Sequence, residues 1–571
     1  MQPLDWLVIT LYFVLIGWVA WWYGRHQKDQ VDFFLAGRNA GWIVIGASIF
    51  TSNIGSEHIV GLAGQGASTG LAMAHWELHA WVLILLAGLF VPFYYKSGVE
   101  TIPQFLEKRF NAKARLILSG VSLVAYVFTK VSVTVYAGAI VFQALMPELA
   151  VHLFGLTLDA FWIGAFLTVI ITGIYTVFGG MRAIMYTATP QAIIILFGSF
   201  VITAIGLHKL GGWGELVTLA KGNASNFALW HPTTMKDILD PGSFPWLGVL
   251  IASPIIGIWY WCTDQYIVQR TLSAKDLPTA RRGALFGGLL KVWPVLIFLV
   301  PGMIGWALHQ RGLMDLPTKM VDGQQVVNGD LVFPTMVKEL LPVGIRGLIV
   351  ACLLAALMSS LASLFNSSAS LFTVDIYEKI RPGRSPKHLL MVGRIATAVV
   401  VVFGIIWIPV MAKVSQGGLY QYLQNVQGYL APPITAVFLL GLFWPRVNGA
   451  GAVWGLAGGF VLGMIKLTFQ TFFGAGEGKY HSPTLFAWIG DFNFLYATGL
   501  LMVVSIILMV VASLATAPPP PEKIRGLTYG SIHAEAAGEI RKSWDTGNKV
   551  MAAVILLAVL AMYTYFTFWL D

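Results

Sequence analysis

The stretch WYWCTDQ, residues 259–265, decides how this chain is organised. It ends an apolar span that begins near Trp246, and it places ionisable and hydrogen-bonding side chains where the apolar run would otherwise continue. Polar groups inside a bilayer are costly, so a stop of this kind indicates a ligand site. An aromatic belt at a helix end is the alternative interpretation. A second polar interruption, TSNIGSEH at residues 51–58, favours the ligand site, because the two breaks can face each other.

The composition is that of a protein that crosses a membrane many times. Of the 571 residues, 57% are apolar and only 11% are charged, whereas soluble proteins have about 25% charged residues. Scanning with a window of about 19 residues predicts an all-α polytopic membrane protein with about 14 transmembrane helices. The two cysteines, Cys262 and Cys352, allow neither a disulfide framework nor a CxxC metal site. The net charge of +9 comes with no aromatic-basic module, so we expect no nucleic-acid partner.

The distribution of Lys and Arg among the loops predicts the orientation of the chain. The basic loops are 25–38, 96–115, 270–282 and 379–387. The short loops 67–76 and 147–157 contain neither Lys nor Arg. Basic loops stay in the cytoplasm, so we expect both termini outside and a location in the plasma or inner membrane.

The spacing of the two breaks predicts an internal repeat. They lie about 205 residues apart, and five spans fit between the start of one and the start of the other. This is the spacing of a five-plus-five inverted repeat of the LeuT type, in which the first helix of each half is broken near the midplane. Unwound backbone at that depth is tolerated only where protein or water satisfies it, and its free carbonyls can bind a cation. The expected segments are 1–40, a leading helix and cytoplasmic loop; 41–244, the first repeat with an outer loop; 245–444, the second repeat; 445–514, two further helices; 515–549, a cytoplasmic linker; and 550–571, a terminal transmembrane helix.

A run of small and hydroxyl-bearing residues, 355–368, has two interpretations. Small residues let helices approach closely, and hydroxyls in transmembrane helices often bond to their own backbone, which is a packing role. Alternatively, the hydroxyls of Ser359 and Ser360 and the carbonyl of Ala356 bind sodium, a hard cation that prefers several oxygen ligands.

The stretch HWELH, residues 75–79, raises the hypothesis of a metalloenzyme. Two histidines four residues apart share a helical face, as in zinc sites, but Glu77 points away from them on a regular helix and no third ligand follows. We therefore expect no enzyme. Glu77 is instead an acceptor for solute hydroxyls or a solvated helix end. Lys291 lies within an apolar span and needs a partner or a hydrated path, and Gln424 and Gln427 bond to a neighbouring helix or to a solute.

Eight short blocks follow one another along the chain. They are FFLAGR at 33–38, GAS at 46–48, SNIGS at 52–56, WYWCTDQ at 259–265, LMSSL at 357–361, DIY at 375–377, YLAPP at 429–433 and RVN at 446–448. In this order they resemble the sodium/solute symporters, and within that family the sodium/glucose cotransporters of animals and bacteria. The resemblance covers nearly the whole chain.

The resemblance implies the inverted-repeat fold with one extra helix before the core, and symport of a hexose with sodium by alternating access. The implied sodium site consists of the carbonyls of Thr51, Ile54 and Ala356 and the hydroxyls of Ser359 and Ser360. The implied sugar site consists of Asn53, His58, Glu77, Tyr126, Tyr260, Trp261, Lys291 and Gln424. In the family the residue matching Tyr260 stacks on the sugar as an inner gate, and His58 is similar to the animal glucose carriers.

Two positions depart from the family pattern. Ala188 stands where the family usually has the Asp of a second sodium site, and Ala362 stands where a two-sodium member has Thr. A hard cation that loses its carboxylate loses most of its binding, so we expect one sodium per sugar. The loop 309–346 lacks Cys, and the cytoplasmic insert before the last helix is short, which favours a bacterial inner-membrane protein. Alternatives are a symporter of another polyol such as inositol, a proton-driven symporter, and a sugar sensor that accumulates nothing.

Overall fold

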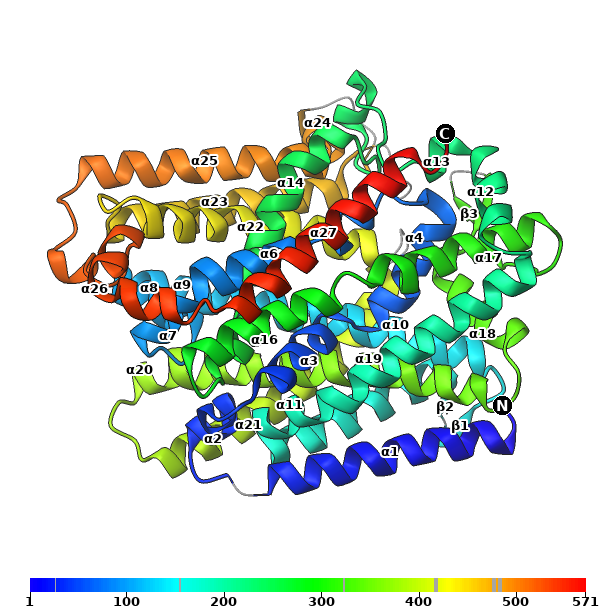
Figure 1. Ribbon diagram of the computed structural model, residues 1–571, viewed down its shortest axis with the longest axis horizontal. Helices are drawn as coiled ribbons and strands as arrows, with labels where there is room; N and C mark the ends of the chain where they lie inside the picture. Colours follow the sequence, from blue (N-terminus) through cyan, green and yellow to red (C-terminus); the bar gives the residue numbers. More distant parts are fainter. Residues whose placement is uncertain (26, 154–155, 322–323, 415–418, 475–478, 481–484) are drawn as a thin grey trace.

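Long apolar helices run side by side through the molecule (Figure 1). The structure is a computed structural model that describes residues 1–25, 27–153, 156–321, 324–414, 419–474, 479–480 and 485–571. Within these residues, eleven helices are long and apolar enough to cross a bilayer. The prediction of an all-helical protein with many membrane crossings is confirmed.

The α-helices of the chain up to residue 230 begin with a long helix and include one helix of 51 residues. They are α1 Pro3–Gly24, α2 Gln30–Leu35, α3 Trp42–Asn53, α4 Leu62–Thr69, α5 Ala74–Glu77, α6 Ala80–Leu85, α7 Val91–Ser97, α8 Ile102–Arg109, α9 Ala112–Ala125, α10 Ser132–Leu145, α11 Ala160–Leu210, α12 Trp213–Lys221 and α13 Ala224–Phe227.

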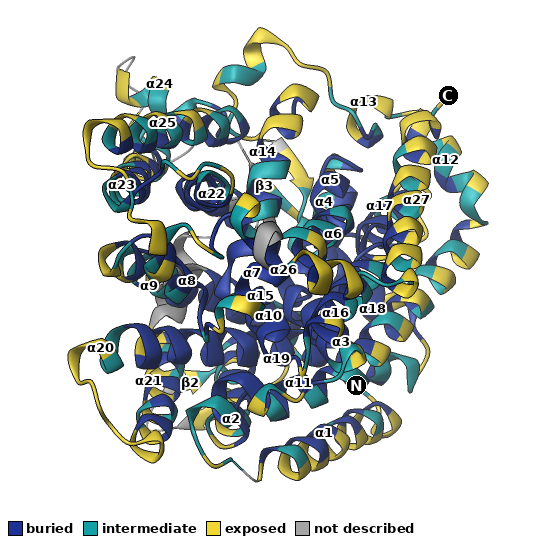
Figure 2. Ribbon diagram, turned by 60° about the vertical axis from the view of Figure 1, so that its left-hand side comes forward, coloured by how far each residue is buried: buried dark blue, intermediate teal, exposed yellow. Residues whose placement is uncertain are grey.

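The remaining α-helices include α19, which belongs to the most buried of the eleven described membrane-length spans. They are α14 Trp246–Ile258, α15 Gln265–Leu272, α16 Leu277–Leu290, α17 Val300–Gln310, α18 Val332–Leu340, α19 Ile345–Ser370, α20 Glu378–Ile380, α21 Pro386–Val414, α22 Leu419–Phe443, α23 Gly449–Phe472, α24 Leu485–Asp491, α25 Phe494–Ala515, α26 Tyr529–Lys542 and α27 Thr546–Phe568. Figure 2 shows buried ribbon around α10, α15 and α19, and exposed faces on α1 and α27.

Short segments of other kinds join or interrupt these helices. The wider π-helical segments are Glu57–Gly61, Leu86–Phe90, Tyr126–Val131, Trp259–Thr263, Val295–Leu299 and Leu371–Tyr377. The 3₁₀ turns are Ala36–Arg38, Met235–Leu239, Gly329–Leu331 and Pro521–Lys523. The strands form two antiparallel hairpins, β1 Val151–Leu153 with β2 Leu156–Leu158, and β3 Thr318–Val321 with β4 Gln324–Val327. The membrane part is thus built from helices, and the strands belong to its connections.

The longest helix, α11, is interrupted by a glycine. Its 51 residues would extend for about 77 Å as one straight helix, far more than the roughly 30 Å of a hydrocarbon core. Gly180 has φ 54° and ψ −162°, outside the helical region. A Cβ atom there would lie 2.8 Å from the carbonyl oxygen of Phe33 and 2.9 Å from the Gln27 side chain. Only glycine permits this bend, which divides α11 into two segments of membrane length.

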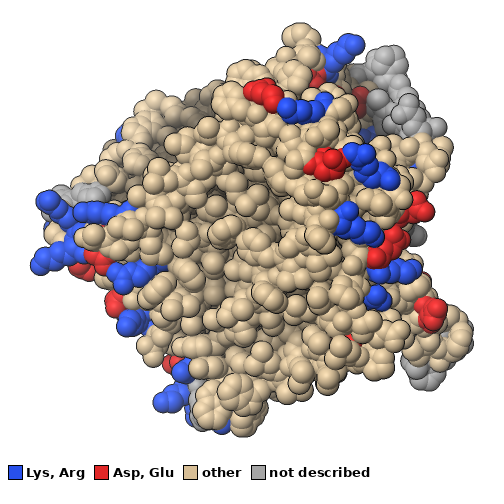
Figure 3. All heavy atoms as spheres, turned by 45° about the vertical axis from the view of Figure 1, so that its right-hand side comes forward, with Lys and Arg blue, Asp and Glu red and all other residues tan. Residues whose placement is uncertain are grey.

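The two ends of the helix bundle carry different loops. Figure 1 marks both chain termini at one end, together with α12 and α13, whereas α2, α8, α20 and α26 lie at the opposite end. The basic loops gather at that opposite end, which we call the inner end. Figure 3 shows Lys, Arg, Asp and Glu at two margins of one face, with an uncharged belt between them. This is the distribution that a bilayer around the belt requires.

The segment expected to be a linker, 515–549, contains a helix and packs against the inner end. Helix α26 lies within it. The Arg281 guanidinium donates to the Ile540 carbonyl at 2.8 Å and to the Ser543 hydroxyl at 2.9 Å. The Asp545 carboxylate caps α27 by accepting from the Asn548 backbone. Contacts with distant residues stabilise this polar segment, and its own sequence pattern did not indicate them.

Helices α4 and α17 approach so closely that glycine is required at their contact. A Cβ atom at Gly302 would lie 1.8 Å from the carbonyl oxygen of Ala63, and one at Gly66 would lie 2.1 Å from that of Leu299. Backbone cannot yield to such overlap as a flexible side chain can. This contact holds α4, which continues the first broken helix, against the second half of the chain.

We expect Gly302→Ala to lower the free energy of unfolding by about 1–3 kcal/mol or more, because the added methyl group overlaps backbone. The control is Gly214→Ala, since a Cβ at that position of α12 meets nothing within 4 Å. Denaturant titration of both variants in detergent micelles measures the difference. Equal stability of the two variants would contradict the packing described for α4 and α17.

Candidate functional site

The first break separates α3 from the π-helical segment Glu57–Gly61. Ile54 is extended, with φ −84° and ψ 98°, and a Cβ on Gly55 would overlap the Glu57 carboxylate. The end of a helix leaves carbonyls without helical partners. Here the Thr51 and Ser52 carbonyls accept hydrogen bonds from side chains of other helices. The break therefore presents backbone oxygens inside the bundle.

The second break has the same local form. The π-helical segment Trp259–Thr263 is followed by Asp264, which is extended with φ −84° and ψ 124°, and then by α15. The Asp264 carboxylate accepts from the Tyr266 backbone amide at 3.3 Å and so caps α15. At both breaks a helix is followed by non-helical backbone, Ile54 and Gly55 at the first and Asp264 at the second, and then by a further helix. π-Helical turns of this kind are frequent at functional sites.

A cavity of about 40 Å³ lies between the two breaks. Its lining comes from both halves of the chain and mixes charged, amide and aromatic side chains. The lining residues are Asn53, Glu57, His58, Trp76, Glu77, His79, Lys130, Ile256, Tyr260, Trp261, Tyr266, Lys291, Ser360, Leu364, Leu423, Gln424 and Gln427. Every residue expected in the sugar site is among them except Tyr126.

A buried lysine organises the polar side of the cavity. The Lys291 ammonium lies 2.5 Å from a carboxylate oxygen of Glu77 and 2.8 Å from the amide oxygen of Asn53. The Asn53 amide nitrogen lies 3.1 Å from the Tyr260 hydroxyl and 3.4 Å from Nε2 of His58. Lys291 therefore has a carboxylate partner and does not extend to the inner surface. Five of the expected sugar-site residues form one connected network.

Gln424 lines the cavity with an acceptor that has no protein partner. Its side chain is 5% exposed, and within the described part of the chain its Oε1 atom accepts no hydrogen bond. A buried polar atom without a partner is costly unless a ligand or water satisfies it. Gln424 is therefore poised to accept from a hydroxyl group in the cavity.

A second buried ion pair, which the sequence analysis missed, lies beside the cavity. The Lys130 ammonium is 2.6 Å from Oδ2 of Asp264, and the Tyr126 hydroxyl donates to the other carboxylate oxygen. Lys130 also lies 4.7 Å from the ring centroid of Tyr260 and 4.6 Å from that of Tyr266. A lone Lys within an apolar span was the available signal, the same one that identified Lys291. Tyr126, expected in the sugar site, instead supports this ion pair.

The residues expected to bind sodium divide into two groups. The Ser359 hydroxyl lies 2.9 Å from the Thr51 carbonyl and 3.0 Å from the Ala356 carbonyl. The Ser360 hydroxyl lies 3.0 Å from the Tyr266 hydroxyl, which also donates to the Ser52 carbonyl. These contacts tie α19 to the end of α3, where Ile54 forms the break. Neutral oxygens gather here from two helices, as a hard monovalent cation requires.

The histidines of the HWELH stretch have separate partners. His75 lies 3.2 Å from the Tyr563 hydroxyl and 3.1 Å from the Leu229 carbonyl. His79 lines the cavity, with Nε2 2.7 Å from the Ser253 hydroxyl. Among the residues that the structure describes, no three His, Cys, Asp or Glu side chains are placed to hold a metal ion. These partners make His75 part of helix packing, whereas His79 belongs to the wall of the cavity.

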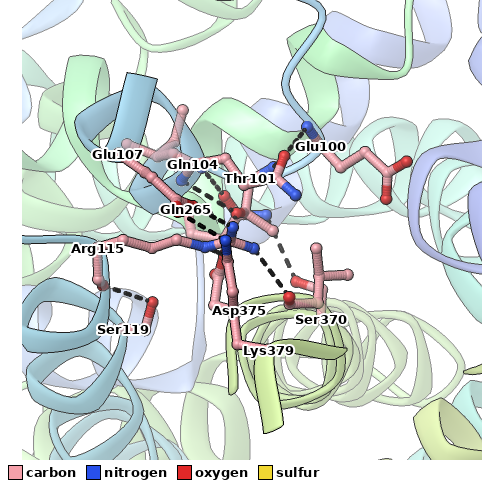
Figure 4. Close-up of polar contacts among 12 residues, drawn as sticks. Glu100, Thr101, Gln104, Glu107, Arg115, Ser119, Gln265, Ser370, Asp375 and Lys379 are labelled. Carbon is pink, nitrogen blue, oxygen red and sulfur yellow. Dashed lines mark hydrogen bonds and ion pairs between the residues drawn. The ribbon is translucent and has the colours of Figure 1, made fainter. Parts of the chain in front are cut away.

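A polar network at the inner end anchors the second break (Figure 4). The Gln265 side chain accepts from the Ile102 amide at 2.8 Å. Asp375 accepts from the Thr101 hydroxyl and from Nε of Arg115, each at 2.7 Å. Figure 4 shows these side chains converging from different helices. The network fixes the start of α15 against the segment Leu371–Tyr377.

Glu107 extends this network toward the surface. It lies 2.5 Å from the Arg115 guanidinium and 2.6 Å from the Lys379 ammonium. Partial burial opposes ionisation of Glu107, but hydrogen bonds from Lys379 and Arg115 outweigh it and hold the pKa of the carboxyl below its usual range. The carboxylate therefore stays ionised and keeps both cations at the inner end.

The sequence and structure are similar to those of known transporters. The family model described as Sodium:solute symporter family matches residues 33–459. The chain is 39% identical over 525 residues to Sodium/glucose cotransporter 1 of Ovis aries, which covers 88% of this chain and 77% of that protein. It is 37% identical over 583 residues to the Sodium/myo-inositol cotransporter of Canis lupus familiaris, covering 97% of this chain and 79% of that protein.

Two solved structures share the fold. A Na⁺-coupled sialic acid symporter in a substrate-bound, outward-open state has a TM-score of 0.74 and 21% identity, covering 90% of this chain and 99% of that one. The nucleobase-cation-symport-1 family transporter MHP1, in a closed conformation, has a TM-score of 0.51 and 13% identity, covering 86% and 97%. At these identities the likeness concerns the arrangement of the helices.

We expect the buried Lys291–Glu77 pair to show strong coupling. Removing either partner leaves an uncompensated charge, so Lys291→Met and Glu77→Gln should each lower the free energy of unfolding by roughly 3–5 kcal/mol. The double variant should lose less than the sum of the two. Denaturant titration in detergent micelles measures the coupling.

The matched control is the Lys96–Glu539 pair at the inner surface, which is solvent-exposed. Lys96→Met and Glu539→Gln should each cost under about 1 kcal/mol. Strictly additive losses at Lys291 and Glu77 would show that their charges do not interact.

Proposed function

We propose that this chain, which belongs to the sodium:solute symporter family, couples the downhill entry of sodium to the uptake of a hexose of the glucose or galactose type. Sodium-coupled symport of a sugar or polyol follows from the family. The hexose and the residues that bind it are our proposal. The observation that carries this proposal is the position of the end of α3. There the Thr51 carbonyl contacts Ser359 in the oxygen cluster, and the Asn53 side chain contacts Lys291 in the polar cavity.

The proposed architecture is the five-plus-five inverted repeat with about 14 crossings. Eleven described helices are long and apolar enough to cross a bilayer. Dividing α11 at Gly180 adds one crossing, and the broken runs 42–69 and 112–145 add one each, which supports this number. The shared geometry of Ile54 and Asp264 supports two related halves. We place both termini outside, because the basic loops lie at the opposite end.

The side chains that line the cavity suit a hexose in two ways. The Lys291 ammonium, the Asn53 amide and the Gln424 amide offer donors and acceptors to sugar hydroxyls. The rings of Tyr260 and Trp261, 5.0 Å apart by centroid, offer flat apolar surfaces for the C–H face of a pyranose. Buried groups of this kind reject analogues that lack a hydroxyl, because the protein group is left unpaired.

In the proposed cycle, the Ser359 hydroxyl turns its hydrogen away from the carbonyls of Thr51 and Ala356, and sodium binds between these carbonyls and the hydroxyl oxygen. Bound there, the ion would tie α3 to α19 and favour the geometry in which Asn53 holds sugar. This is a coupling free energy, so sugar must also tighten sodium binding. Each sodium that enters through 100 mV contributes about 2.3 kcal/mol to accumulation.

Uptake into proteoliposomes tests the function. We expect labelled glucose or galactose to accumulate with an inward sodium gradient, and not with a potassium or proton gradient of the same size. Preferential accumulation of myo-inositol would assign the chain to the other class of relatives. Binding without accumulation would support a sensor and reject transport.

The missing oxygens at Ala188 and Ala362 predict one sodium per sugar. Both side chains are buried and carry only a methyl group. With one charge moved per sugar, the reversal potential of the sugar-induced current should shift by about 59 mV for each tenfold change in the ratio of sugar concentrations across the membrane. A shift of roughly half that size would mean two sodium ions and contradict the prediction.

We expect Ser359→Ala and Ser360→Ala to raise the sodium concentration for half-maximal uptake by roughly tenfold or more, because each removes an oxygen next to the ion. The control is Ser505→Ala, whose hydroxyl bonds to the Leu501 carbonyl of its own helix. Sodium titrations of uptake by equally expressed variants measure the effect. Unchanged activation by sodium in both serine variants would remove the site from α19.

A further inference from the structure

A long apolar groove lies on the outside of the bundle, between α9, the segment Leu371–Tyr377 and α21. Its volume is about 560 Å³, within the usual range of about 300–1,000 Å³ for ligand sites. Its lining includes Val124, Phe372, Tyr377, Val392, Ala396 and Phe403. Tyr377 alone among them carries a polar atom. None of these residues lines the cavity between the breaks.

The length of the groove matches one leaflet of a bilayer. Its lining residues on α21 extend from Val392 to Phe403, which is roughly 17 Å along a helix at 1.5 Å per residue. The hydrocarbon core of a bilayer is about 30 Å thick. An apolar channel of half that length fits a single acyl chain.

The polar end of the groove is marked by Tyr377. Its hydroxyl lies 2.8 Å from Nε2 of His388, at the start of α21. Residues 381–388, which form the loop after α20 and the start of α21, are all exposed. Lipid head groups lie where an acyl chain leaves the apolar core, so this loop is the place for a head group.

The loop at this end carries positive charge that the protein does not compensate. Lys379 is paired with Glu107 at 2.6 Å. In the described part of the chain, no ion pair joins Arg381, Arg384 or Lys387 to an acidic side chain. Three cations beside an apolar groove between helices have the chemistry that binds anionic head groups.

We propose that the groove is a binding site for an anionic glycerophospholipid of the surrounding bilayer. One acyl chain lies along α21, and the phosphate lies at Arg384 and Lys387. Ordinary boundary lipid would also cover apolar helices, but it would show no preference for a negative head group. The charge of the loop is what distinguishes the two cases.

The site borders the network at the inner end. Phe372 and Tyr377, which line the groove, belong to the same π-helical segment as Asp375, which binds Arg115 and Thr101. A bound lipid therefore packs against the segment that anchors the second break. Its occupancy stabilises the inner end without contact to the cavity.

Native mass spectrometry of the purified full chain in detergent tests the proposal. We expect one phosphatidylglycerol to be retained roughly tenfold better than phosphatidylcholine with the same acyl chains. The double variant Arg384→Gln with Lys387→Gln should reduce retention of phosphatidylglycerol to the level of phosphatidylcholine. Ala396→Phe, which fills the groove, should weaken retention of both lipids.

The matched control is Arg541→Gln with Lys542→Gln, two exposed cations of α26 at the same end, which should leave retention unchanged. Glycerol 3-phosphate should fail to compete, since it has no acyl chain. Equal retention of the two lipids by the unaltered chain, or retention that survives the charge variant, would show boundary lipid only. Lipid-free dimers would instead make the groove a contact between copies and overturn the proposal.

Discussion

The Lys291 ammonium must be neutralised inside a helix bundle, and the site is arranged around that requirement. Glu77 supplies the opposite charge and Asn53 supplies a neutral oxygen, at 2.5 Å and 2.8 Å. Because Asn53 is the last residue of α3, the lysine also fixes the end of the first break. Helix α3, which ends at Asn53, and helix α16, which ends directly before Lys291, cannot move apart without leaving a buried charge in apolar surroundings. The geometry of the proposed sugar cavity therefore depends on this ion pair as well as on packing.

A broken helix allows one short segment to serve two neighbouring sites. The carbonyl of Thr51 faces Ser359, and two residues later the side chain of Asn53 faces Lys291. A continuous helix would bind its own carbonyls and leave none for an ion. In the proposed symport this proximity is the physical basis of coupling. A change at the oxygens around Ser359 moves the end of α3, and with it the Asn53 amide that faces Lys291. No long pathway through the protein is needed.

Much of this arrangement was predictable from the sequence, because polar residues within apolar spans are rare. That signal identified the two breaks and Lys291, and the resemblance to a family supplied further cavity residues such as His58 and Gln424. Lys130 gave the same signal but had no visible partner, since Asp264 lies 134 residues away in the sequence. The helix α26 was missed because contacts such as Arg281 with Ile540 stabilise it. Partners distant in the sequence, and the exact contact of a hydroxyl such as that of Ser360, required the structure.

The two breaks both contain an extended residue between helices but differ in how their polar groups are satisfied. At the second break the Asp264 carboxyl group already has a partner within the protein, the Lys130 side chain, at 2.6 Å. At the first break the carbonyls of Thr51 and Ala356 are met by the neutral hydroxyl of Ser359. A hydroxyl can turn its lone pairs toward an incoming ion, whereas an ammonium would repel it. The asymmetry favours the first break as the place where a mobile cation enters and leaves, whereas the second break already has its partner within the protein.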